Sequence, residues 1–290
     1  MKTQTFGIEL EMKGITRAKA AEVIAAHFGT TVRHTASIDG YDCRRVDDGT
    51  GRDWKVVSDA SIDDISPRQT EVVSPILRWE DIETVQALVR DLRDAGAKAD
   101  SSCGIHIHIG RGQHTAKTLR NLVNIVNAKE DLLTMALEIE PTRRSHWCKP
   151  VEADFLRRLN TARPRNDEHF ARLWYNDANW QRRAHQHYDH SRYHLLNLHS
   201  VFQKGTIEFR AFNSTLHAGK VKAYIQLCMA ISYQALTASS ASPIRPNTDN
   251  PKYTFRCWLL RLGFIGDEFE SARYHLLKPL PGNAAWRQAS

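Results

Sequence analysis

The stretch Cys103-Gly104-Ile105-His106-Ile107-His108-Ile109-Gly110 alternates isoleucine with histidine. A period of two is typical of a β-strand, in which residues two apart share a face. His106 and His108 therefore point to one side of the predicted strand, and the isoleucines point to the other. The apolar side suits packing against helices, and the imidazole side suits metals or phosphates. For this stretch alone, a solvated His-x-His face is the alternative interpretation.

Two further stretches, Thr5–Met12 and Thr206–Phe212, repeat this design. Their polar positions at i and i+2 are Glu9 and Glu11 in the first stretch, and Glu208 and Arg210 in the second. Adjacent carboxylates repel each other unless a cation lies between them, although solvated acids on an exposed strand remain the alternative. If the three strands belong to one sheet with helices on its apolar side, all six polar side chains can line the uncovered face.

Two more acids extend this group. Asp59 lies in a turn-like segment after the predicted strand Trp54–Val57, and Glu71 lies in the predicted strand Gln69–Pro75, where an ordinary edge-strand glutamate is the alternative. Carboxylates outnumber the other groups, and hard oxygen ligands favour Mg²⁺ or Mn²⁺ over zinc. Magnesium also leaves coordination positions for phosphate oxygens. The pattern predicts a surface that holds a polyphosphate through metal ions.

Composition narrows the class of protein. The chain has 290 residues, of which 41% are hydrophobic and 25% charged, and this suits one large globular domain, or two small ones, with a core that needs no disulfides. Five scattered cysteines without a Cys-x-x-Cys pair, no long apolar run and no signal-like N-terminus predict a cytoplasmic protein that does not enter a membrane. Lys and Arg exceed Asp and Glu by 7, which suits an anionic substrate such as ATP.

The segment from about 142 to 192 differs from the rest, because it is rich in Arg, His and Trp and has weak periodicity. One interpretation is a lid or an insertion that recognises the substrate. The alternative is a set of helices on the protein surface whose arginines are solvated. Beyond it, Tyr193–His199 and Thr206–Phe212 predict a β-hairpin, and helices are expected from about 217 to 280. Three residues just before the last polar strand are candidates for contact with a substrate, or for satisfying the hairpin edges: Arg192, Asn197 and His199.

Four motifs occur in a fixed order: Gly7-x-Glu9-x-Glu11, Thr70-Glu71-Val72-Val73-Ser74-Pro75, Cys103–Ile109 and Thr206–Arg210. Each motif alone is weak, but in this order they closely resemble the amidoligase family over about Phe6 to Leu236. That family belongs to the carboxylate–amine ligase superfamily of glutamine synthetase and glutamate–cysteine ligase. The resemblance implies an α+β fold in which a curved antiparallel sheet, backed by helices, carries the active site on its concave face. It implies a single catalytic domain over 1–290, like the catalytic domain of glutamine synthetase.

The activity implied by this resemblance is an ATP-dependent ligase that uses Mg²⁺ or Mn²⁺. A substrate carboxylate attacks the γ-phosphate of ATP to give an acyl phosphate and ADP, and an amine then displaces phosphate to form an amide. The expected partners are a small-molecule or peptide carboxylate and an amine, and a homo-oligomer is left open.

The resemblance also implies roles for individual residues. The expected metal ligands are Glu9, Glu11, Asp59, Glu71, His106 and Glu208. Asp59 departs from the pattern, because glutamine synthetase has a glutamate at this position. His108 resembles the contact to the nucleotide phosphates, a task expected to involve Glu9 and Arg210 as well. Arg210 is expected to stabilise the transferring phosphoryl group, with Glu71 and Glu208 completing the catalytic set.

Two other functions compete with the ligase. The first is a metal-dependent hydrolase in which His106, His108 and acids bind zinc, but the sequence has no His-Glu-x-x-His motif and carboxylates dominate. The second is a nucleic-acid-binding protein that uses the arginines between Arg143 and Arg192. The absence of a basic tail or repeated Lys/Arg block weighs against it, and it gives no reason for three strands that carry acids or histidines.

Overall fold

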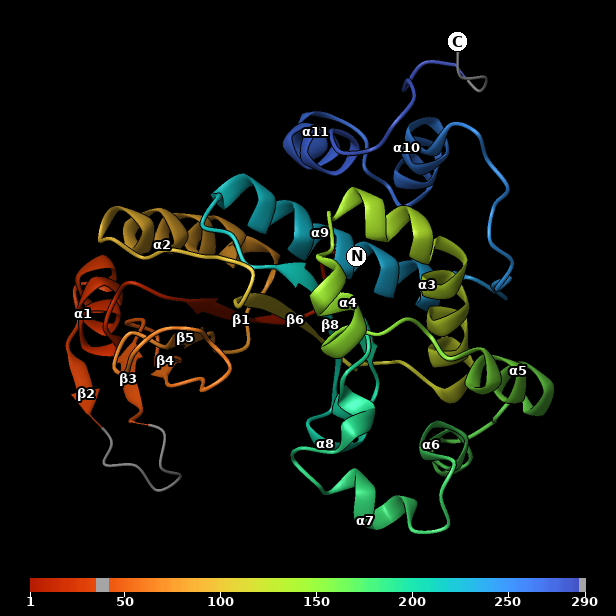
Figure 1. The fold of residues 1–290 in the computed structure, drawn as a ribbon, viewed down its shortest axis with the longest axis horizontal. Helices are drawn as coiled ribbons and strands as arrows, with labels where there is room; N and C mark the ends of the chain where they lie inside the picture. Colours follow the sequence, from red (N-terminus) through yellow and green to blue (C-terminus); the bar gives the residue numbers. More distant parts are fainter. Residues whose placement is uncertain (35–41, 287–290) are drawn as a thin grey trace. The chain divides into compact units, whose positions relative to one another are not determined.

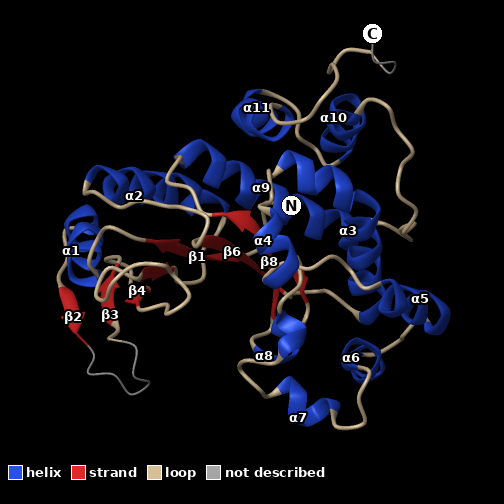
Figure 2. Cartoon of the chain, in the orientation of Figure 1, coloured by secondary structure: helices blue, strands red, loops and turns tan. Residues whose placement is uncertain are grey.

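The computed structural model of the protein describes residues 1–34 and 42–286. Its strands, drawn in red in Figure 2, form an open antiparallel sheet backed by helices. The strand order is β2-β3-β4-β5-β1-β6-β8-β7. The predicted α+β class and antiparallel sheet are confirmed. Contacts divide the chain into an N-terminal unit, Lys2–Ile107 with Phe212–Ile225, and a C-terminal unit, His108–Ala211 and Gln226–Ser290 with Met1. The single catalytic domain stays a prediction.

The N-terminal unit holds most of the strands and the first two long helices (Figure 1). Its elements are β1 (Phe6–Met12), α1 (Arg17–Phe28), β2 (Val32–His34), β3 (Arg44–Asp47), β4 (Asp53–Val57), β5 (Thr70–Val73), η1 (Trp79–Asp81) and α2 (Ile82–Asp94). It also contains the first part of β6 (Gly104–Gly110), the end of β8 (Thr206–Asn213) and the start of α9 (Ala218–Thr237).

Local signals in the sequence set the ends of α1. The side chain of Thr16 caps the helix by accepting a hydrogen bond from the backbone N–H of Lys19. Gly29 ends it in the left-handed conformation, with φ of 66°, which glycine adopts without strain. The helix packs against α2, β3 and β4, and its residues Ala21 and Ile24 are fully buried. This packing covers one face of the strands and leaves the other for polar side chains.

The C-terminal unit is mainly helical. Its elements are α3 (Ala116–Ala136), α4 (Pro141–His146), α5 (Ala153–Ala162), α6 (Asp167–Tyr175), α7 (Trp180–Ala184), η2 (His190–Arg192), β7 (Leu196–Asn197), α8 (His199–Gln203), α10 (Pro251–Arg261), η3 (Asp267–Phe269) and α11 (Glu270–Leu277). It also contains the end of β6, most of β8 and the remainder of α9. The basic segment 142–192 therefore folds into a run of short helices, drawn in green in Figure 1. Among all helices of residues 1–34 and 42–286, none combines the length and apolar character that a membrane crossing requires.

The predicted hairpin is correct in its pairing and wrong in its connection. Strand β7 pairs antiparallel with β8 and places Leu196 opposite Phe209, but the strand is only two residues long, and helix α8 follows it. The chain turns because Leu198 has helical dihedral angles and the side-chain oxygen of Asn197 accepts a hydrogen bond from the backbone N–H of His199. The period-two pattern continues through this turn, so the sequence overestimates the length of the strand.

A buried histidine makes the stability of the C-terminal unit depend on pH. Burial lowers the pKa of His114 to about 4 from its ordinary 6.5, and its ring nitrogens contact the hydroxyls of Thr118 and Ser232. Because the unfolded chain binds this proton at a higher pH than the folded chain, the free energy of unfolding is highest above pH 6.5 and falls as the pH drops toward 4. Between about pH 7 and about pH 5, we expect this group alone to remove about 2 kcal/mol.

The measurement is denaturant unfolding at both pH values for the wild-type protein and His114→Gln. The variant is expected to lose this part of the pH dependence, while His146→Gln, which alters an exposed histidine, retains it. An unchanged pH dependence in His114→Gln would show that His114 is not kept neutral by the fold.

Candidate functional site

Strand pairing in the N-terminal unit places two glutamates side by side. β1 and β5 are antiparallel, and Glu11 lies directly opposite Glu71. Residues opposite each other in such a pair point to the same face. β4 lies on the other side of β5 with Val57 opposite Glu71, and Asp59 follows Val57 by two residues. Like charges opposite each other destabilise a sheet, so this register favours a bound cation.

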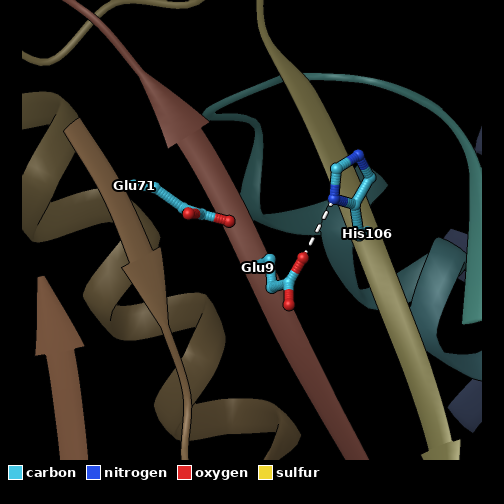
Figure 3. A group of neighbouring side chains, drawn as sticks. All are labelled: Glu9, Glu71 and His106. Atoms are coloured by element: carbon cyan, nitrogen blue, oxygen red, sulfur yellow. Dashed lines mark hydrogen bonds and ion pairs between the residues drawn. The ribbon is translucent and has the colours of Figure 1, made fainter. Parts of the chain in front are cut away.

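Side-chain atoms in this unit form two overlapping groups with the spacing of a metal site. Atoms of Glu11, Asp59 and Glu71 lie within 4.8 Å of one another, and so do atoms of Glu9, Glu71 and His106 (Figure 3). Glu71 belongs to both groups. We name the five residues the acidic cluster: Glu9, Glu11, Asp59, Glu71 and His106.

The imidazole of His106 is hydrogen-bonded to one carboxylate and lies close to a second. Nδ1 of His106 lies 3.0 Å from Oε2 of Glu9, the contact drawn in Figure 3, and Nε2 lies 3.7 Å from Oε1 of Glu11. The second oxygen of Glu11 accepts a hydrogen bond of 2.5 Å from the backbone N–H of Gly104, at the start of β6. Glu11 and His106 are buried. The fold therefore orients these donors before any ligand arrives.

The chemistry of the donor atoms fits a hard divalent cation. One group consists of three carboxylates, which suits Mg²⁺ or Mn²⁺. The other combines two carboxylates with an imidazole, a set that Mn²⁺ also accepts. No cysteine belongs to either group, so the soft thiolate ligands of structural zinc sites do not contribute.

The C-terminal unit assembles a second set of polar residues around Glu208. Nη1 of Arg210 donates a hydrogen bond of 2.6 Å to Oε1 of Glu208, and the amide nitrogen of Asn197 donates one of 2.7 Å to Oε2. All three residues are at most 5% exposed. Charge-assisted hydrogen bonds at this depth are short and strong, so both carboxylate oxygens have fixed positions.

Neighbouring residues hold Arg210 and His108. The backbone N–H of Arg210 donates to the carbonyl oxygen of Leu195, and its guanidinium lies 5.9 Å from the ring centre of Tyr193. Nδ1 of His108 contacts the hydroxyl of Thr206 at 2.9 Å, while Nε2 lies 4.0 Å from Glu208. A guanidinium and an imidazole fixed in this way provide donors for phosphate oxygens.

The three predicted substrate residues occupy different environments. Asn197 holds Glu208 in position. His199 is buried between the Tyr175 hydroxyl and the Gln186 carbonyl oxygen, and burial lowers its pKa. Arg192 lies over the rings of Tyr188 and Tyr193 and donates to the carbonyl oxygen of His187. For Asn197 and His199, the observed contacts are those of residues that hold the structure in place.

Each unit thus brings together part of the predicted site: the acidic cluster in the N-terminal unit, and His108, Glu208 and Arg210 in the C-terminal unit. That both parts line one surface stays a prediction. Sequence reasoning missed Thr206 and Tyr193. Thr206 could have been found, because it lies two residues before Glu208 on the same face of β8. Nothing in the pattern around Tyr193 signals its contact with Arg210.

Comparison with known proteins gives a match of almost the same extent as the motifs. Residues 2–232 match the family described as putative amidoligase enzyme, and this region includes every residue of the acidic cluster as well as Glu208 and Arg210. A search of curated proteins gave no match. The family description supports an enzyme that joins molecules through an amide bond. The chain therefore belongs to the amidoligase family.

Proposed function

We propose that this protein is an ATP-dependent carboxylate–amine ligase that works through an acyl phosphate with Mg²⁺ or Mn²⁺. The observation that carries the proposal is the register of β1 and β5, which sets Glu11 against Glu71 and makes Glu71 common to two groups of potential metal ligands. A protein gains nothing in stability from facing carboxylates unless a cation offsets their repulsion.

The residues divide the proposed work between them. The acidic cluster holds the divalent cation, which would supply charge neutralisation for the ATP phosphates. Arg210 and His108 donate to phosphate oxygens, and Glu208 holds the guanidinium of Arg210 in one orientation. Asn197 in turn fixes Glu208. Because charge spreads over the transferring phosphoryl group, donors that are already oriented lower the barrier without reorganising during the reaction.

The balance of the reaction follows from its two steps. A carboxylate oxygen of the substrate forms a bond to the γ-phosphorus, and the bond from that phosphorus to the β–γ bridging oxygen breaks as ADP leaves. The amine then attacks the carbonyl carbon of the acyl phosphate, the bond from that carbon to the phosphate breaks, and the amine loses a proton. The products are an amide, ADP and inorganic phosphate.

The competing functions explain fewer observations. The mechanism of a zinc hydrolase does not require a buried arginine bound to a buried glutamate. Phosphoryl transfer does require an oriented cationic donor of this kind. Binding of nucleic acid through the segment 142–192 would need unpaired cations. Several of its arginines are already paired with acids: Arg157 and Arg158 with Asp154, Arg172 with Glu168, and Arg183 with Asp189.

The test is release of ADP by the purified protein with Mg²⁺ or Mn²⁺, ATP and pooled amino acids and peptides. Mass spectrometry then searches for a new amide. We expect ADP release that requires the cation and a carboxylate substrate. Hydrolysis of an amide without ATP would favour the hydrolase, and tight, steeply salt-dependent binding of DNA or RNA without ADP release would favour the nucleic-acid function.

A further inference from the structure

The C-terminal unit contains a cavity of about 250 Å³ that none of the predicted site residues lines. Helix α3 contributes Val123 to its wall, helices α5 and α6 contribute Phe155 and Trp174, and the chain around β7 contributes Leu196 and Leu198. Cavities for drug-sized ligands are typically larger, about 300–1,000 Å³. This cavity therefore suits a ligand of amino-acid size.

The cavity lies on the opposite face of the sheet from Glu208. In β7, Leu196 is opposite Phe209 and lines the cavity, whereas Asn197 is opposite Glu208 and bonds to it. Successive residues of a strand point to opposite faces, and opposed residues on paired strands point to the same face. A ligand in the cavity therefore cannot reach Glu208 or Arg210 through the sheet.

Hydrogen bonds join the elements that form the walls of the cavity. Helices α3 and α5 are joined by reciprocal hydrogen bonds between the amides of Asn124 and Asn160. The indole N–H of Trp174 donates to the hydroxyl of Ser191 in η2. Arg183 donates twice to Asp189 and once to the carbonyl oxygen of Tyr175. These bonds hold the cavity open before a ligand arrives, which reduces the entropy lost on binding.

Arg158, which lines the cavity, offers a donor for a carboxylate. Among the described residues, the hydrogen bonds of Arg158 use only Nε, toward Asp154, and Nη1, toward the carbonyl oxygen of Leu173. Asp154 also accepts from Arg157, so one carboxylate serves two guanidiniums. The remaining N–H groups on Nη2 of Arg158 are therefore suited to an anion.

The polar residues near His194 offer acceptors for an ammonium. Nδ1 of His194 donates to the carbonyl oxygen of Ser191, which leaves Nε2 of the neutral ring as an acceptor. Oε1 of Glu152 lies 3.5 Å from this Nε2, and the Glu152 side chain is 66% exposed, so it can move to meet a ligand. The same cavity is lined by the rings of Phe155 and Trp174, whose centroids are 5.1 Å apart.

We propose that this cavity binds a small zwitterion with an apolar side chain, an α-amino acid or a dipeptide. Its carboxylate binds Arg158, its ammonium binds Glu152 and His194, and its side chain packs on Phe155 and Trp174. This part of the proposal rests on the proposed ligase function: the bound zwitterion acts as an effector that changes the rate of ADP release. The chain between His194 and Leu198 borders the cavity, and within it Leu195 and Asn197 hold Arg210 and Glu208.

Binding is measured by saturation-transfer NMR and calorimetry with L-phenylalanine and with the dipeptide phenylalanyl-glycine. We expect a Kd of about 1 mM or below for at least one of them, and the comparison of the two identifies the ligand length. L-Phenylalaninamide, which lacks the carboxylate, and 3-phenylpropionate, which lacks the ammonium, should each bind at least about 10-fold more weakly. Equal binding of all four compounds, or of none, would overturn the proposal.

Two matched pairs of variants locate the ligand. Arg158→Gln should weaken binding about 10-fold or more, whereas Arg157→Gln, its neighbour on the same Asp154, should have no effect because Arg157 does not line the cavity. Glu152→Gln should weaken binding as well, while Glu168→Gln, which alters an exposed residue of α6 that does not line the cavity, should not. Glu152 is exposed, so its variant tests the site even if Arg158→Gln is unstable. Unchanged affinity in both cavity variants would place the ligand elsewhere.

Activity separates this proposal from the ligase function. If the enzyme releases ADP, saturating zwitterion should change the rate in the wild-type protein and in Arg157→Gln but not in Glu152→Gln. Binding that depends on Arg158 and Glu152 in a protein without ADP release would support the cavity and count against the ligase function. Site-specific binding without a change in the ADP release of an active enzyme would overturn the effector role.

Discussion

The Glu71→Gln variant is expected to bind Mn²⁺ at least about 100-fold more weakly than the wild-type protein, because even residues outside the coordination shell change metal affinity by about 10- to 100-fold. Glu71 contributes to both groups of potential ligands, so a single substitution removes a carboxylate from each. Glutamine keeps the size of the side chain and loses its charge. Removing one of two facing carboxylates also relieves repulsion between β1 and β5, so the metal-free variant should unfold at a temperature equal to or above that of the metal-free wild type.

Titration of Mn²⁺ followed by electron paramagnetic resonance measures this affinity directly and needs no substrate. Asp59→Asn serves as a comparison, since Asp59 belongs to one group only and should cause a smaller loss. Glu83→Gln, on the exposed surface of α2, is the control for a general loss of negative charge. If Glu71→Gln and Glu83→Gln bind Mn²⁺ with the affinity of the wild type, the acidic cluster is not a metal site.

The Arg210→Lys variant is expected to release ADP about 100- to 1,000-fold more slowly, the range found when one oriented donor to a developing negative charge is removed. Arg210 uses Nη1 to bind Glu208 and lies over the Tyr193 ring, so its planar fork is held in one orientation. Lysine keeps the charge but offers a compact ammonium without the fork. Lysine therefore cannot bind Glu208 and at the same time donate a hydrogen bond to a phosphate oxygen with the geometry that the guanidinium allows.

The rate of ADP release at saturating ATP and Mg²⁺ measures this effect, and circular dichroism with thermal unfolding shows whether the variant is folded. Arg182→Lys, which alters an exposed arginine of helix α7, makes the same chemical change far from Glu208 in sequence and should leave the rate within about 2-fold. A wild-type rate in folded Arg210→Lys would remove Arg210 from the mechanism and leave it as an ion-pair partner of Glu208.

The faces of the three polar strands could be predicted because the alternation of side chains is a local property of an extended backbone. His106 and Glu9 belong to such alternating stretches, and their hydrogen bond places them together in one unit. Asp59 could not be placed by alternation, since it lies in a turn after β4, and only the pairing of β4 with β5 brings it near Glu71. The connection between β7 and β8 was predicted wrongly because a side-chain hydrogen bond of Asn197, which periodicity does not reveal, turns the chain into α8.

The sequence by itself determined which side chains share a face with the acids and histidines, and it determined the family through the order of four motifs. It did so because the period of a strand and the order of motifs are encoded by neighbouring residues. Only the tertiary structure decided that Glu71 faces Glu11, that the side chain of Asn197 donates a hydrogen bond to Glu208, and that the helices of the basic segment line a cavity behind β7. These features depend on strand register and helix packing, which join residues far apart in the chain and leave no local pattern.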